Sequence, residues 1–235
     1  MDLKEVMAYL ESKGSEQTRR IFTNHGAVGA LFGVKVGDLK PIEKKERNNQ
    51  ALALELFATG NSDAQYLAGL IANPKELTED QLTEWASGAS WYMISEYAVA
   101  WNVAESPLCV GLCRKWIDSD SAAFQSCAWA ALSSYVGMAP NETIDLTFMR
   151  GLLERIEKEI HTAANRVRYT MNGFVIALGA AHPEMTEACK MLGDRIGKVE
   201  VHMGETACKV PQIRPYIEKI EGKGRIGAKK KGAKC

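Results

Sequence analysis

The sequence has no apolar run near the roughly 20 residues that a bilayer-spanning helix needs. Its N-terminus, Met1 to Met7, is charged from the second residue and has no apolar segment followed by a small-residue cleavage site. These absences argue against a membrane protein and against a secretory signal. We therefore expect a cytoplasmic protein without a membrane partner.

The sequence also lacks the motifs of several catalytic and metal-binding classes. The glycines between Gly26 and Gly33 have no Gly-Lys-Ser/Thr after them and no predicted strand before them, so they do not predict a nucleotide site. No Gly-x-Ser-x-Gly nucleophile elbow is present. The histidines lie far apart, and the pair Cys109 and Cys113 fits buried thiols on a helix better than zinc ligands. We expect no metal and no cofactor.

Charge is unevenly distributed along a chain whose net charge is zero. Residues 209–235 carry an excess of seven positive charges, and the rest of the chain carries the matching negative excess. A basic segment of this kind is typical of contact with an anionic partner, but it also occurs as a solubilising tail. We predict one domain over residues 1–221 and a flexible basic tail over residues 222–235, which has no apolar period.

Apolar residues recur at helical spacing nearly everywhere, and strand-like alternation is almost absent. Thr78 with Gln81 predicts a capping box, and Ser106 with Pro107 predicts another helix start. Helical pairs then begin near residues 48, 78, 106, 143 and 183, at spacings typical of a helical-hairpin repeat. These features predict an all-α fold, a curved stack of antiparallel HEAT-like helical pairs with a concave inner surface. An irregular α-bundle is the alternative.

The segment from Ser90 to Trp101 carries the most information about a site. At about 100° per residue, Trp91 and Trp101 share a face that is expected to be buried, whereas Tyr92 and Glu96 share another. An aromatic ring beside a carboxylate on that second face suits a groove. The same pair also fits a tyrosine at the rim of the core with a solvated glutamate next to it.

Four further stretches stand out by their residue order: LFGVKVGDLK at 31–40, ALELF at 53–57, DAQYLA at 63–68 and WASGASW at 85–91. They resemble the AlkD-like DNA alkylation repair family, and the likeness covers most of the chain. The resemblance implies a stack of HEAT-like helical pairs that binds duplex DNA in a concave basic groove. Active members release N-alkylated purines as monofunctional glycosylases.

The resemblance also implies roles for particular residues. The family pattern Trp-Trp-Asp-x-x-Asp is matched here by Trp91 to Glu96, with Tyr92 as the aromatic wall and Glu96 as the carboxylate that stabilises the sugar cation. The helix matching residues 124–129 lacks the family arginine, and Ile176 stands where the family has a second groove tryptophan. These departures weaken the expectation of catalysis.

Three functions therefore remain. We favour a non-catalytic DNA-binding protein that recognises damaged or distorted duplex DNA. The alternatives are an alkylpurine DNA glycosylase that uses Tyr92 and Glu96, and a helical scaffold that binds a protein partner. The predicted DNA-binding residues are Arg166, Arg168, Lys223, Arg225, Lys229, Lys230 and Lys231.

Overall fold

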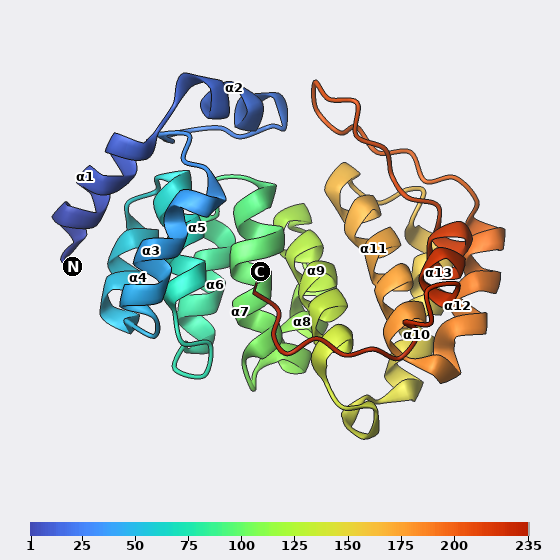
Figure 1. Ribbon diagram of the computed structural model, residues 1–235. Helices are drawn as coiled ribbons and strands as arrows, with labels where there is room; N and C mark the ends of the chain where they lie inside the picture. The colour runs from blue at the N-terminus through green and yellow to red at the C-terminus, as the bar shows by residue number, and fades with distance from the viewer. Residues whose placement is uncertain (235) are drawn as a thin grey trace. The chain divides into compact units, whose positions relative to one another are not determined.

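The computed structural model describes residues 1–234, and every regular element among them is a helix. Figure 1 shows the labelled helices along the chain. The all-α class that the apolar periodicity predicted is confirmed. No helix within residues 1–234 is both long and apolar enough to cross a membrane.

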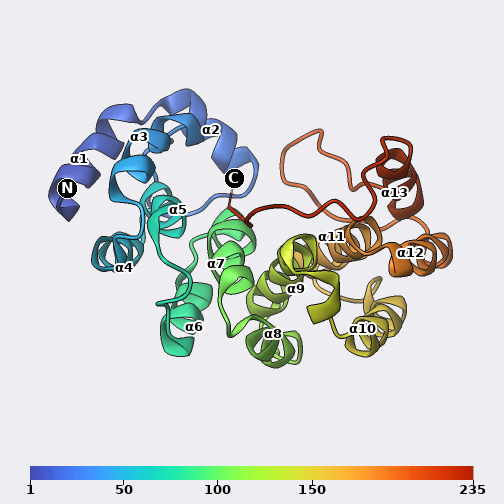
Figure 2. The same cartoon turned by 60° about the horizontal axis from the view of Figure 1, so that its bottom comes forward.

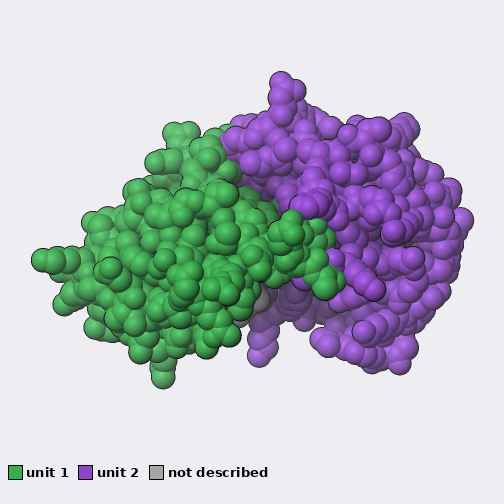
Figure 3. All heavy atoms as spheres, turned by 90° about the horizontal axis from the view of Figure 1, so that it is seen from above, with its two compact units in different colours: residues 1–108, 203–207, 234 green, residues 109–202, 208–233, 235 purple. Residues whose placement is uncertain are grey.

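The described residues divide into two compact units, which Figure 3 shows in different colours. Unit 1 comprises residues 1–108, 203–207 and 234, and unit 2 comprises residues 109–202 and 208–233. In a helical repeat each pair of helices packs mainly against its neighbours, so the chain separates readily into such groups. The single domain over residues 1–221 stays a prediction.

Unit 1 contains seven α-helices and one π-helix. They are α1 (Leu3–Lys13), α2 (Glu16–Asn24), α3 (Val36–Glu46), α4 (Gln50–Ala58), α5 (Ser62–Ile71), α6 (Glu79–Gly88), the π-helix η1 (Ile94–Val99) and α7 (Ala100–Glu105). Helix α5 is buried along its whole length and packs against α3, α4 and η1, so it forms the centre of this unit.

Unit 2 contains six α-helices and one short 3₁₀ turn. They are α8 (Cys109–Ile117), α9 (Ala122–Met138), the 3₁₀ turn η2 (Asn141–Thr143), α10 (Leu146–Glu159), α11 (Asn165–Ala181), α12 (Pro183–Ile196) and α13 (Ile213–Glu221). Helix α9 packs against α8 and α11, and α11 packs against α12 and α13. Figure 2 shows α9 and α11 side by side.

Side-chain caps fix helix ends largely where the sequence predicted them. The capping box at Thr78 is confirmed: the Gln81 N–H donates to the Thr78 hydroxyl at 3.2 Å, and the Thr78 N–H donates to the Gln81 side chain at 3.0 Å. The helix predicted to begin at Ser106 begins at Cys109 instead. Ser106 ends α7, and its hydroxyl accepts the Leu108 N–H at 3.1 Å, which turns the chain before α8.

The segment from Ser90 to Trp101, for which α-helical spacing was expected, contains the π-helix η1. It packs directly on α5, because Gly69 has no side chain to hold Ala98 away; a Cβ at Gly69 would lie 2.6 Å from the Ala98 Cβ. The Asn102 amide donates to the carbonyls of Ala98 at 2.7 Å and Gly69 at 2.9 Å. These bonds satisfy carbonyls where the α-helical pattern is broken.

The core of unit 2 is built on aromatic and small residues. The rings of Trp129 on α9 and Phe174 on α11 lie 5.3 Å apart, and both side chains are fully buried. Gly179 faces Cys189 and Ile217, and Gly193 faces Ile213, at distances that leave no room for a Cβ. These two glycines allow α11, α12 and α13 to approach one another closely.

Several residues of the C-terminal segment, residues 222–234, make hydrogen bonds to the helices, and the flexible tail predicted for residues 222–235 stays a prediction. In unit 2 the Gly227 N–H donates to the Ala180 carbonyl and the Lys230 N–H to the Gly137 carbonyl, both at 2.8 Å. In unit 1 the Lys234 ammonium donates to the Ala72 carbonyl at 2.6 Å. Carbonyls at helix ends have no partner within their own helix, so they accept such donors readily.

Candidate functional site

Tyr92 and Glu96, the predicted catalytic pair, do not reach one open surface. Glu96 is only 5% exposed and Tyr92 is half-buried, so the prediction of a shared exposed face is wrong for Glu96. That prediction assumed α-helical spacing, whereas residues 94–99 form a π-helix, in which hydrogen bonds run to the fifth residue and the faces rotate. The predicted burial of Trp91 and Trp101 is confirmed. A catalytic role for the pair stays a prediction.

Helix α2 and the residue after it supply aromatic neighbours to this region. The Tyr92 hydroxyl lies 3.5 Å from Nδ1 of His25, and the rings of Tyr92 and Trp91 are 5.0 Å apart. The ring of Phe22 on α2 lies 5.8 Å from that of Trp91. Trp91 and Tyr92 are therefore in contact with each other and with side chains from α2 and the residue after it.

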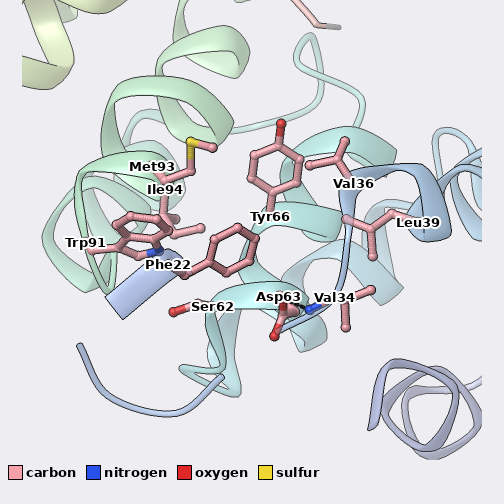
Figure 4. Close-up of a pocket in the computed structure, with 10 residues that line it drawn as sticks. All are labelled: Phe22, Val34, Val36, Leu39, Ser62, Asp63, Tyr66, Trp91, Met93 and Ile94. Carbon is pink, nitrogen blue, oxygen red and sulfur yellow. Dashed lines mark hydrogen bonds between the residues drawn. The ribbon is translucent and has the colours of Figure 1, made fainter. Parts of the chain in front are cut away.

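A small cavity remains beside this cluster, and Figure 4 shows the residues around it. Its volume is about 20 Å³, and its walls include Phe22, Tyr66, Trp91 and Ile94. At its edge the Asp63 carboxylate accepts the backbone N–H groups of residues 32, 33 and 34 at 2.6, 3.0 and 2.9 Å. A cavity of this size holds about one water molecule, so no purine fits there.

A much larger cleft of about 500 Å³ lies in unit 2. We call it the basic cleft. Its floor consists of small and apolar residues of α9 and α11, and its rim carries five cations from α13 and the C-terminal segment. The floor includes Gly137, Gly173, Ile176, Ala177 and Ala180, and the rim cations are Lys219, Lys223, Arg225, Lys229 and Lys230.

No carboxylate lines the basic cleft, and no ion pair joins its five cations to a carboxylate within residues 1–234. The Lys229 ammonium donates to the Val136 carbonyl at 2.8 Å. Burial lowers the pKa of Lys229, and the nearby Glu142 partly offsets this shift. The other four cations are exposed, so the cleft presents concentrated positive charge to an anion.

The fold thus brings together four of the residues predicted to bind DNA: Lys223, Arg225, Lys229 and Lys230. Lys231 is exposed next to Lys230 but does not line the cleft. The four cleft residues lie together because the C-terminal segment is hydrogen-bonded to the ends of α9 and α11.

Arg166 and Arg168 lie on different faces of α11. At 100° per residue, Arg166, Tyr169, Gly173 and Ala177 form one stripe, which runs into the floor of the basic cleft. The Arg166 guanidinium lies over the Tyr169 ring, 4.4 Å from its centre. Arg168 points to another side of the helix, and its buried Nε has no hydrogen-bond partner within residues 1–234. Neither arginine is among the residues that line the cleft.

Two residues of the basic cleft were missed by the sequence analysis: Tyr216 and Lys219 of α13. The spacing Tyr216, Lys219, Lys223 is that of three side chains on one face of a helix, next to the face of the buried Ile213 and Ile217. That pattern was readable in the sequence. The proximity of this face to α11 was not, because it depends on tertiary packing.

The described residues 1–234 contain no group of three or more His, Cys, Asp or Glu side chains placed to hold a metal ion. Within the same range, the buried cysteines are free thiols, and burial raises the pKa of Cys189 to about 12. The described residues therefore offer a positively charged cleft on a scaffold of packed helical pairs. Helical-repeat proteins use such scaffolds to bind extended ligands.

Comparisons with known proteins agree with a helical-repeat protein. The sequence model of the family described as "DNA alkylation repair enzyme" matches residues 6–188. Lin0241 from Listeria innocua and Lmo0209 from Listeria monocytogenes, both described as uncharacterized, are each 33% identical over 220 residues. Those residues cover 91% of this chain and 95% of each relative. The chain belongs to the DNA alkylation repair family.

A solved structure shares the fold with a TM-score of 0.93 and 34% sequence identity, covering 100% of both chains. It is described as "A new family of proteins related to the HEAT-like repeat DNA glycosylases with affinity for branched DNA structures". This likeness confirms the HEAT-like repeat fold that the sequence predicted.

Proposed function

We propose that this protein binds DNA through the basic cleft of unit 2 without removing bases, and that it prefers branched or distorted DNA. The observation that carries the proposal is the set of five cations on the cleft rim, without an opposing carboxylate in the lining. Cations placed in this way neutralise backbone phosphates and release counterions. The family and the affinity of the solved relative for branched DNA support the same function.

Two observations argue against the glycosylase alternative. The cavity beside Trp91 holds no more than about one water molecule, and Glu96 is buried in a π-helix. A carboxylate that stabilises a sugar cation must lie where the sugar can approach it. The scaffold alternative has no specific contact in its favour. A protein partner and a cytoplasmic location stay predictions.

The proposal is tested by removing charge from the cleft rim. In a variant with Lys219, Lys223 and Lys230 all changed to Gln, DNA affinity should fall, and the slope of log affinity against log salt should decrease by roughly two to three. Fluorescence anisotropy on a four-way junction and on a linear duplex, at several salt concentrations, measures both quantities.

The matched control changes Lys44, Lys45 and Lys75 of unit 1 to Gln, which removes the same charge from exposed positions outside the cleft. This control should retain the native salt slope. An equal loss in both variants would show that net charge alone governs binding, and it would contradict the cleft as the binding site. Equal native affinity for the junction and the duplex would contradict the preference for branched DNA.

A further inference from the structure

Tyr216 is an unusual component of the basic cleft. Tyr216 is 44% exposed and lies on the same face of α13 as Lys219, and Lys223 follows the end of this helix. Within residues 1–234 no aromatic ring or cation is stacked on it. An exposed aromatic ring among lysines therefore has an unoccupied face inside a positively charged cleft.

The floor of the basic cleft consists of small and apolar residues. Its residues from α11 are Gly173, Ile176, Ala177 and Ala180, and Gly137 comes from α9. A Cβ added at Gly137 or Gly173 would meet nothing within 4 Å, so the space above both glycines is open. The cleft thus combines an apolar floor, an aromatic ring and a cationic rim.

This combination suits a nucleotide more than a phosphate alone. Phosphates need only the cations, and the ring and apolar floor add nothing to that contact. A base gains from both, because aromatic side chains stack on bases of any sequence while cations follow the backbone. In duplex DNA the faces of the bases are covered by their neighbours, so Tyr216 can stack only on a base that is unpaired or at a strand end.

We propose that the basic cleft binds unpaired nucleotides of single-stranded DNA, with Tyr216 as the stacking platform and the rim cations on the phosphates. The volume of about 500 Å³ lies within the range of pockets that enclose small ligands, about 300 to 1,000 Å³. The inference rests on the proposed function. It explains a preference for branched DNA, because branch points expose unpaired or weakly stacked bases.

The experiment compares Tyr216→Ala with Tyr216→Phe on a ten-nucleotide oligothymidine and on a covalently closed circular duplex, which has no strand ends. Removal of the ring should weaken binding to the single strand by about tenfold and change duplex affinity by less than about twofold, since only the single strand stacks. Tyr216→Phe keeps the ring and should retain native affinity. The salt slope should be the same in all three proteins, because no cation is removed.

Met191→Ala is the control for exposed apolar surface, because Met191 is also exposed in unit 2 and does not line the cleft. It should bind like the native protein. A 2-aminopurine base in the oligonucleotide should lose fluorescence on binding to the native protein and keep it with Tyr216→Ala. Thermal melts check that the variants fold, as expected for an exposed helical position.

The outcomes separate the two proposals. Equal affinity of native protein and Tyr216→Ala for the single strand, with loss of binding in Lys223→Gln, would overturn the stacking site and leave DNA binding by the cleft intact. Equal weakening of single strand and duplex by Tyr216→Ala would also overturn it. No binding of the native protein to any of these DNAs would overturn the proposed function itself.

Discussion

Gly69 determines how closely the π-helix η1 approaches α5. The nearest neighbours of its missing Cβ are backbone and Cβ atoms of Ala98, at 2.6 to 3.0 Å, and these atoms cannot rotate away. Both residues are buried at the centre of unit 1. The position of η1, and so of Trp91 and Glu96, depends on this contact between two small residues.

We predict that Gly69→Ala destabilises the protein by about 1 to 3 kcal/mol, because the added methyl group overpacks the α5 interface. Gly111→Ala is the matched control, since Gly111 is also helical but a Cβ added there would meet nothing within 4 Å. The control should stabilise by about 0.5 to 1 kcal/mol through helix propensity. Urea denaturation measures both. Similar stability changes in the two variants would contradict the close packing at Gly69.

At the scale of elements, α13 is the helix that completes the basic cleft. Its buried side is short, with Ile213 and Ile217 as its fully buried residues. Ion pairs to α12 supplement this small interface: Arg214 donates to the Asp194 carboxylate at 2.7 and 2.8 Å, and Lys190 donates to Glu221 at 2.7 Å. The position of Tyr216 and Lys219 therefore depends on charge pairs as well as on apolar contact.

We predict that Asp194→Asn lowers the melting temperature at pH 7, because Arg214 loses its charged partner. The hydrogen bond from Arg214 lowers the pKa of the Asp194 carboxyl in the folded protein. A lowered folded pKa means that the stabilisation is present above the ordinary pKa and is lost as the pH falls through the folded pKa. The difference between native protein and variant should therefore shrink as the pH approaches 3.

The control for this comparison is Asp120→Asn, at an exposed carboxylate for which the described residues show no ion pair. Its melting temperature should follow that of the native protein at both pH values. A gap between native protein and Asp194→Asn that stays constant from pH 7 to pH 3 would contradict the contribution of the Arg214 pair.

At the scale of the whole molecule, the cations of the basic cleft and the residues that match the family's active-site pattern belong to different units. Five of the cations that the sequence concentrates in residues 209–235 line the basic cleft of unit 2. The residues that match the family's active-site pattern, Trp91 to Glu96, lie in unit 1 beside a cavity of about 20 Å³. The basic cleft therefore does not include the residues that match the family's active-site pattern.

We predict that the native protein releases no N-alkylated purine from alkylated duplex DNA above the spontaneous rate, and that Glu96→Gln behaves in the same way. The physical reason is that the Glu96 carboxylate is buried, so a sugar cation cannot readily approach it. Chromatography of released bases measures the rate. Release by the native protein, reduced by at least about 10²-fold in Glu96→Gln, would establish the glycosylase alternative instead.

Local patterns were enough to predict the helices and most of their ends. The apolar periodicity, the capping box at Thr78 and the resemblance over residues 31–91 predicted an all-α HEAT-like protein of the DNA alkylation repair type. These signals are carried by residues within a few turns of one another, so they can be read along the chain. The clustering of Lys223, Arg225, Lys229 and Lys230 was equally visible in the composition.

Tertiary structure alone decided where these groups lie. The π-helix η1 depends on packing at Gly69 and on the Asn102 amide, so α-helical spacing put Glu96 on the wrong face. The cleft exists because Gly179 and Gly193 allow α13 to approach α11 and α12, and because carbonyls of α9 and α11 hold the C-terminal segment. Contacts between residues distant in sequence have no local signature, and they placed Tyr216 among the cations.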